Sequence, residues 1–312
     1  MNSVAPPVYR LHWRIPALGV AQIVAWGTLY YAVAVLATPM SNALGLGKSF
    51  VYGCFTAALL ISGALSPWVG RRIDRDGGRS TVAASAVAGG LAFLLLANAH
   101  GWWTCLLAWS VAGVAMGLGL YDAMMAVLNP LAPGARYRRA VTALTLFGGF
   151  ASTVFWPLTH FLVVNTDWRM TCEIYALLLW GLCLPLYLLA IPRASRAVAT
   201  APAAAPPAAS VPRDRRRFRA LAAAFALVSF AFSVFSAHLV DLLGAAGINA
   251  ADAILIGAAV GPTQVVARVV EYVFAPRLRA VTVGRIAFGL MAAALVILAA
   301  LDGQRWLAAC FA

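Results

Sequence analysis

The sequence predicts an all-helical membrane protein that crosses the bilayer several times, and three observations support this prediction. Hydrophobic residues occupy 63% of the 312 positions and charged residues only 11%, whereas an ordinary globular domain is about 25% charged. The apolar residues form runs of about 20 residues or more, the length that a helix needs to cross a bilayer. None of these runs shows the alternating pattern of about ten residues that is typical of an outer-membrane barrel strand.

The net charge of +13 indicates the membrane surface as a partner. The basic residues lie in short clusters between apolar runs, where they can face the cytoplasm and anionic headgroups. We therefore expect the lipid bilayer as a partner and no nucleic acid. The five cysteines show no paired spacing, so we interpret them as small core residues and predict no disulfide framework and no metal site: Cys54, Cys105, Cys172, Cys183 and Cys310.

Nine stretches are long and apolar enough to be membrane helices, which satisfy their own backbone hydrogen bonds in lipid. The first follows Arg10 and Arg14, as a signal-peptide core would. It is too long for such a core and has no obvious cleavage site, so we interpret it as a span. A tenth stretch begins near Trp306. The nine are Ile15–Met40, Val51–Val69, Thr81–Ala99, Trp102–Asn129, Ala140–Val164, Thr171–Ile191, Phe218–Val240, Ala250–Phe274 and Thr282–Leu301.

The distribution of Lys and Arg predicts the orientation. Of the 23 basic residues, 19 lie in the N-terminus or in the connections after spans two, four, six and eight. This count includes the first residues of the span that follows each connection. The other connections hold 3, and Arg268 lies inside a span. Basic residues gather in cytoplasmic loops. We therefore expect an inner (plasma) membrane protein with its N-terminus in the cytoplasm.

One long connection divides the chain. It contains an Ala/Pro tract at 199–209, followed by Arg213, Arg215, Arg216 and Arg217. Such a tract predicts an extended cytoplasmic linker, and the arginines are expected to lie on anionic headgroups. The predicted organisation is a six-helix repeat at 1–191, a linker at 192–217 and a partial second repeat at 218–312. This is the layout of a transporter built from two parallel repeats, with the second repeat incomplete.

The connection between spans two and three carries the most specific motif. It reads Gly70-Arg71-Arg72-Ile73-Asp74-Arg75-Asp76-Gly77-Gly78-Arg79, which resembles the major facilitator superfamily signature Gly-x-x-x-Asp-Arg-x-Gly-Arg-Arg/Lys. The glycines are expected to form a tight turn. Gly78 departs from the signature, which has a basic residue there. The resemblance implies a gating role for the matching residues, which hold one conformation closed by pairing with neighbouring helices: Gly70, Asp74, Arg75, Gly77 and Arg79.

Other segments resemble the oxalate/formate and monocarboxylate porter branch of that superfamily. They are residues 25–31 and 39–40 of the first span, residues 44–47 just after it, residues 63–67 of the second span, residues 148–152 of the fifth, and Asp167-Trp168-Arg169 after the fifth. The resemblance covers essentially the whole chain. It implies alternating access by two repeats and a small organic anion as substrate.

Ionisable residues inside spans are costly in lipid and face a cavity or a partner. Arg268 and Glu271 lie one helical turn apart in the eighth predicted span, so they can form a structural pair. The resemblance implies instead that Arg268 binds a carboxylate, for which its guanidinium fork is suited. Glu271 is then a proton-coupling group or the partner that holds Arg268. Gln264, one turn earlier, is expected to share this face.

Aromatic residues of the first repeat are further candidates. Trp26, Tyr30 and Tyr121 lie on spans that line the central path in the superfamily, although most aromatic residues in such a chain pack or lie at interfaces. Asp122 follows Tyr121 and is either cavity-lining or close to the cytoplasmic end. Gly113 and Gly117 form a Gly-x-x-x-Gly pattern, which indicates close helix packing.

These observations favour a secondary active transporter. No complete Walker-type loop and no metalloprotease motif occurs, so we predict no enzyme activity and no cofactor. The expected partners are a small-molecule substrate, which we expect to be a monocarboxylate-like anion, and a coupling proton or counter-solute. One alternative is a drug or metabolite exporter of the same superfamily. Another is a truncated, transport-inactive protein, because the second repeat would normally supply three more helices.

Overall fold

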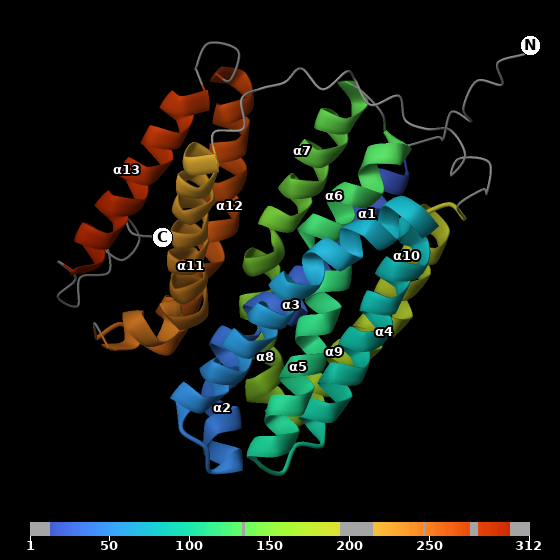
Figure 1. Ribbon diagram of the computed structural model, residues 1–312. Coiled ribbons are helices and arrows are strands. Elements are labelled where there is room, and N and C mark those ends of the chain that lie inside the picture. The colour runs from blue at the N-terminus through green and yellow to red at the C-terminus, as the bar shows by residue number, and fades with distance from the viewer. Residues whose placement is uncertain (1–12, 133–134, 194–214, 246, 275–279, 300–312) are drawn as a thin grey trace, which may run out of the picture. The chain divides into compact units, whose positions relative to one another are not determined.

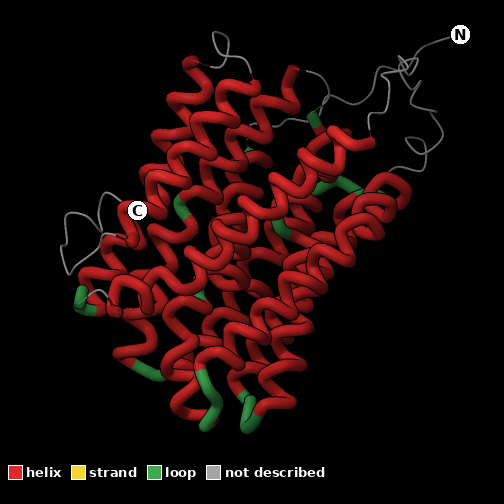
Figure 2. Tube along the Cα trace, turned by 60° about the vertical axis from the view of Figure 1, so that its left-hand side comes forward, coloured by secondary structure: helices red, strands yellow, loops and turns green. Residues whose placement is uncertain are grey.

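The structure is a computed structural model that describes residues 13–132, 135–193, 215–245, 247–274 and 280–299. All regular elements in these residues are helices (Figure 2), as predicted. The chain divides into two compact units, residues 1–194 and 195–312, and each is considered by itself. The helices of the second unit are α11 (Arg215–Ala245), α12 (Ala250–Phe274) and α13 (Ala280–Ala299).

The first unit is a bundle in which several membrane-length segments are interrupted (Figure 1). The first segment comprises three pieces, and the fourth, fifth and sixth comprise two or three each. The elements are α1 (Arg14–Trp26), η1 (Gly27–Tyr31), α2 (Val33–Leu44), α3 (Lys48–Asp76), α4 (Gly78–Ala97), α5 (Trp102–Gly119), α6 (Tyr121–Leu131), α7 (Ala135–Gly149), α8 (Ala151–Asn165), α9 (Trp168–Leu178), η2 (Leu179–Cys183) and α10 (Leu184–Ala190).

Each of the nine predicted stretches coincides with helix in the described residues. Six helical segments there are long and apolar enough to cross a membrane, or seven if α1 to α2 form one bent span. In the described parts of α12 and α13, the apolar segments are shorter, at Ala251–Ala267 and Gly284–Ala294. The count of nine spans, the two-repeat arrangement and the predicted domain boundaries therefore remain predictions.

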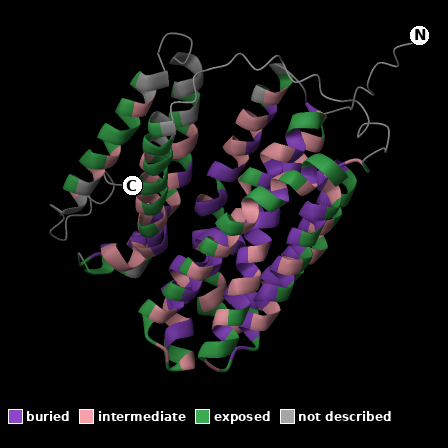
Figure 3. Cartoon of the chain, viewed as in Figure 1, coloured by how far each residue is buried: buried purple, intermediate pink, exposed green. Residues whose placement is uncertain are grey.

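Large apolar side chains lie on the outside of the first unit. Leu60 is 70% exposed, Leu177 67% and Leu189 66%, while buried residues concentrate where helices face one another (Figure 3). Contiguous exposed apolar surface is rare on soluble monomers. On transmembrane helices it faces lipid, whose tails are as apolar as leucine.

Close helix contacts bring the core together. Helix α5 packs against both α3 and α4, and a Cβ at Gly113 would overlap the backbone carbonyl of Ala58 on α3. This bears out the packing predicted from the Gly113–Gly117 spacing. Four of the five cysteines are buried in helices, and Cys310 lies outside the described residues. The largest fully buried side chains include Trp109, Trp156, Tyr175, Tyr187 and Phe93.

Candidate functional site

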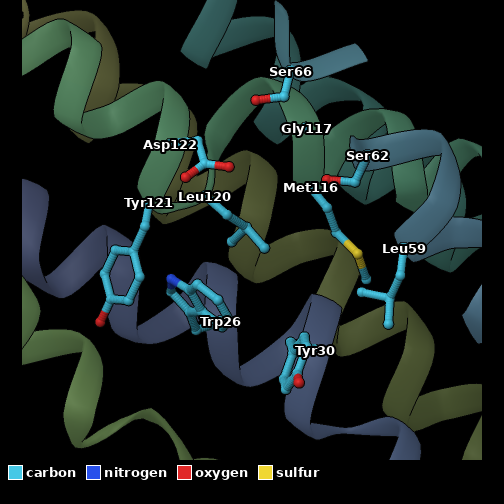
Figure 4. A pocket seen from close by; sticks show the side chains of 10 residues that line it. All are labelled: Trp26, Tyr30, Leu59, Ser62, Ser66, Met116, Gly117, Leu120, Tyr121 and Asp122. Carbon is cyan, nitrogen blue, oxygen red and sulfur yellow. The ribbon is translucent and has the colours of Figure 1, made fainter. Parts of the chain in front are cut away.

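A cavity of about 220 Å³ opens among α1, η1, α3, α5 and α6 of the first unit. Its lining combines three aromatic rings, two serine hydroxyls and one carboxylate with apolar side chains (Figure 4). Three of the sequence-predicted residues meet here, and they come from positions almost 100 residues apart. The lining residues are Trp26, Tyr30, Leu59, Ser62, Ser66, Met116, Gly117, Leu120, Tyr121 and Asp122.

The π-helical segment η1 carries Tyr30 and begins directly after Trp26, the last residue of α1. A π turn inserts one residue into an α-helix and leaves backbone carbonyls that side chains can satisfy, and such turns are frequent at functional sites. Here the Thr28 hydroxyl donates to the Val24 carbonyl at 2.8 Å, and the Trp156 indole N–H donates to the Tyr31 carbonyl at 2.9 Å. The chain then bends by 41° into α2. Trp26 and Tyr30, on either side of the beginning of η1, both line the cavity.

The fourth segment is broken at the cavity wall. Helix α5 ends at Gly119 and α6 begins at Tyr121, because Leu120 is extended, with φ −77° and ψ −166°. The fully buried Gln22 side chain donates from Nε2 to the Gly119 carbonyl at 2.8 Å. Gln22 therefore satisfies a carbonyl at the interruption, where the helical ladder is broken. Sequence reasoning missed Gln22, although an amide inside an apolar run was a visible signal.

The aromatic residues form one connected cluster. The Trp26 ring centroid lies 4.7 Å from that of Tyr121 and 5.1 Å from that of Tyr30, edge to face. The Tyr121 hydroxyl donates to the Thr145 carbonyl at 3.4 Å. The buried Trp26 Nε1 has no hydrogen-bond partner among the described residues. A buried N–H without an acceptor costs about 1–3 kcal/mol, so an oxygen of a bound solute would be stabilised there.

Asp122 supplies the charge of this cavity. It lies in the first turn of α6 and remains accessible, and its carboxylate faces the same space as Trp26 (Figure 4). Asp122 forms no hydrogen bond or ion pair with another described residue. Of the two positions that the sequence left open for Asp122, the structure selects the cavity.

The comparison with known families agrees with this architecture. Residues 18–312 match the Major Facilitator Superfamily. The chain belongs to the major facilitator superfamily. It is therefore an integral multi-pass membrane protein of a family of secondary transporters. No curated protein matches the sequence.

The second group of predicted residues lies on α12. Gln264 is half-buried there. Arg268 and Glu271 occupy α12 one helical turn apart, as predicted, but their side chains lie outside the described residues. Their pairing and their contact with a substrate remain predictions. A site that these α12 residues share with Trp26, Tyr30 and Tyr121, which belong to the first unit, also remains a prediction.

The superfamily signature is more helical than the sequence suggested. Gly70 is not in a turn, since α3 continues as helix to Asp76. The turn is made by Gly77 alone, whose φ of 80° favours glycine. Arg75 donates to its neighbour Asp76 at 3.0 and 3.1 Å on an exposed surface. The gating role of this segment, with Asp74 and Arg79, stays a prediction.

The structure explains the departure from the superfamily signature at Gly78. Gly78 begins α4 and is buried. A Cβ there would overlap the Val127 side chain of α6. The close contact between α4 and α6 therefore excludes the basic side chain that the signature has at this position.

The Asp167-Trp168-Arg169 segment has a structural role. The Asp167 carboxylate accepts a hydrogen bond from the Met170 N–H at 2.8 Å and so caps α9. The Arg169 guanidinium donates to the carbonyls of Ala97, the last residue of α4, and of Ala99, just after the helix. It also lies over the Trp168 ring, 4.4 Å from its centroid. The segment ties the beginning of α9 to the end of α4.

Proposed function

We propose that this protein is a secondary active transporter that moves a small organic solute by alternating access. The supporting observation is the cavity at which the first and fourth segments of the bundle are both interrupted. Discontinuous helices form the substrate and ion sites of many secondary transporters, because an interrupted helix presents polar backbone and side-chain groups inside the membrane. A proton or counter-solute gradient supplies the energy, since no ATP-binding loop is recognisable in the sequence.

We propose a monocarboxylate-like anion as the solute, as in the porter branch that the sequence resembles. Arg268 binds the carboxylate with its guanidinium fork, and Gln264 contributes a further hydrogen bond. Glu271 balances the charge of Arg268 or carries the coupling proton. Support comes from the position of these residues on one helix and from the cost of placing a charge in lipid without a function.

Uptake into membrane vesicles tests the anion proposal. Right-side-out vesicles that contain the protein are supplied with a radiolabelled panel of lactate, formate and oxalate. Replacing Arg268 with Ala removes a charge-assisted hydrogen bond of about 1.5–3 kcal/mol, so we expect uptake to fall at least about tenfold. Arg285→Ala, which removes an exposed charge from α13, is the matched control and should transport normally. Unchanged uptake in the Arg268→Ala variant contradicts the proposal.

A second candidate is an exporter of drugs or metabolites. One observation favours it: the charged residue that lines the described cavity is acidic, not basic. Inside-out vesicles that accumulate a cationic dye under a proton gradient, and that take up no carboxylate, would identify the exporter.

We also propose an inner-membrane location with a cytoplasmic N-terminus. The support is the asymmetric distribution of basic residues. Reporter fusions after residues 76 and 166 test it. A cytoplasmic reporter should be active at the first position and a periplasmic reporter at the second, and the opposite pattern contradicts the orientation.

A further inference from the structure

The chemistry of the cavity in the first unit is specific. The charged residue of its lining is Asp122, and the other polar side-chain groups are the hydroxyls of Ser62, Ser66 and two tyrosines and the indole N–H of Trp26. A carboxylate in a cavity lined by aromatic rings repels an anion. A carboxylate attracts a cation, and aromatic faces add to that attraction.

The local fold accounts for only part of this arrangement. Asp122 lies near the N-terminus of α6, where a negative charge is stabilised by the helix dipole. It does not cap the helix, however, because the residue before α6 is Leu120 and no side-chain cap is formed. A carboxylate that served only the helix end would not need the rings of Trp26 and Tyr121 beside it, 4.7 Å apart at their centroids.

The aromatic residues are held in position from behind. Tyr121 is anchored through its hydroxyl to the Thr145 carbonyl, and Tyr30 packs edge to face on Phe55 at 5.6 Å. Rings that are fixed in this way present their faces with little loss of entropy when a ligand binds. The indole N–H of Trp26 has no acceptor in the described part of the chain, and an oxygen carried by the same ligand would satisfy it.

We propose that this cavity binds the ammonium group of an organic solute that also carries a hydroxyl or carboxylate oxygen. Asp122 supplies the countercharge, the rings of Trp26, Tyr30 and Tyr121 surround the cationic head, and Trp26 Nε1 donates to the oxygen. The inference rests on the proposed function in that the solute must reach the cavity. It concerns the cavity of the first unit alone and a different charge of the solute from the one proposed for Arg268.

Three probes of one shape separate charge from size. Choline carries a trimethylammonium head and a hydroxyl, 3,3-dimethyl-1-butanol is its neutral carbon isostere, and 3,3-dimethylbutanoate is the matching anion. Their binding to the full chain in lipid nanodiscs is measured by ligand-observed NMR titration, with empty nanodiscs subtracted. We expect choline to bind at least about tenfold more tightly than either isostere. Equal affinities, tighter binding of the anion, or no binding of choline overturns the proposal.

Two variants locate the effect. Asp122→Asn keeps the size of the side chain and removes its charge, so the preference for choline over the neutral isostere should disappear. Glu173→Gln on α9, which removes the charge of a carboxylate that does not line the cavity, should keep the preference and serves as the matched control. A preference that survives in Asp122→Asn contradicts the assignment. If that variant does not fold, as judged by its thermal unfolding, Trp26→Leu decides, because it should weaken choline at least about threefold more than the neutral isostere.

These results are independent of transport. Binding is measured without a gradient, so choline selectivity in a protein that transports nothing would support the cavity assignment and contradict the proposed function. Carboxylate uptake without choline selectivity would support the proposed function and contradict the cavity assignment.

Discussion

The contact between α5 and α3 makes a sharp prediction at Gly113. Replacing Gly with Ala inside a helix normally stabilises it by about 0.8–1.0 kcal/mol, because glycine loses more backbone freedom on folding. At Gly113 the added Cβ would lie 2.7 Å from the Ala58 Cα and would overlap the Ala58 carbonyl. Backbone atoms cannot move aside as a flexible side chain can, so the two helices must separate.

The expected magnitude follows from these two effects. Overpacking costs about 1–3 kcal/mol, and separation of the helices also weakens the similar contact of Gly117 with Ser62. After subtraction of the gain in helix propensity, we expect Gly113→Ala to destabilise the protein by up to about 2 kcal/mol. Gly53→Ala on α3 is the matched control, because no described atom lies within 4 Å of its added Cβ. It should be neutral or slightly stabilising.

Thermal unfolding in detergent micelles, followed by helical circular dichroism, measures both variants. The melting temperature of Gly113→Ala should fall while that of Gly53→Ala stays the same or rises. The reasoning is refuted if the two variants have equal melting temperatures.

Three further predictions concern stability and are checked by the same measurement. Gly78→Arg restores the basic residue of the superfamily signature but should destabilise the protein by about 1–3 kcal/mol, and Val127→Ala should recover part of this loss. Arg169→Ala removes two hydrogen bonds to carbonyls at the end of α4 and should cost about 1.5–3 kcal/mol, whereas an unchanged melting temperature would show that the tie is unimportant. Trp156→Phe leaves the Tyr31 carbonyl without its donor and should cost about 1 kcal/mol, with no effect expected from Trp103→Phe at the exposed surface.

The helices were predictable because lipid imposes one simple rule. A backbone in hydrocarbon must satisfy its own hydrogen bonds, so each long apolar stretch coincides with helix, and α12 has the same bounds as its prediction. The exclusion of a basic residue at Gly78 was not predictable. It depends on Val127, which lies on another helix about 50 residues further along the chain.

The candidate site was predicted only in part. Trp26, Tyr30 and Tyr121 were expected to line the path, and the structure places all three at one cavity. The position of Asp122 was undecided, and Gln22 was overlooked. Both depend on the break at Leu120, and a hydrogen bond between residues 22 and 119 leaves no periodic signal in the sequence.

The sequence by itself determined that this chain is a helical membrane protein of the major facilitator superfamily. Composition, apolar length and one signature segment are local properties, and each can be read along the chain. Only the tertiary structure decided where the helices are interrupted and which side chains meet there. The physical reason is that the carbonyls freed by η1 and by the break at Leu120 must find donors, and these donors come from Trp156 and Gln22 on distant segments.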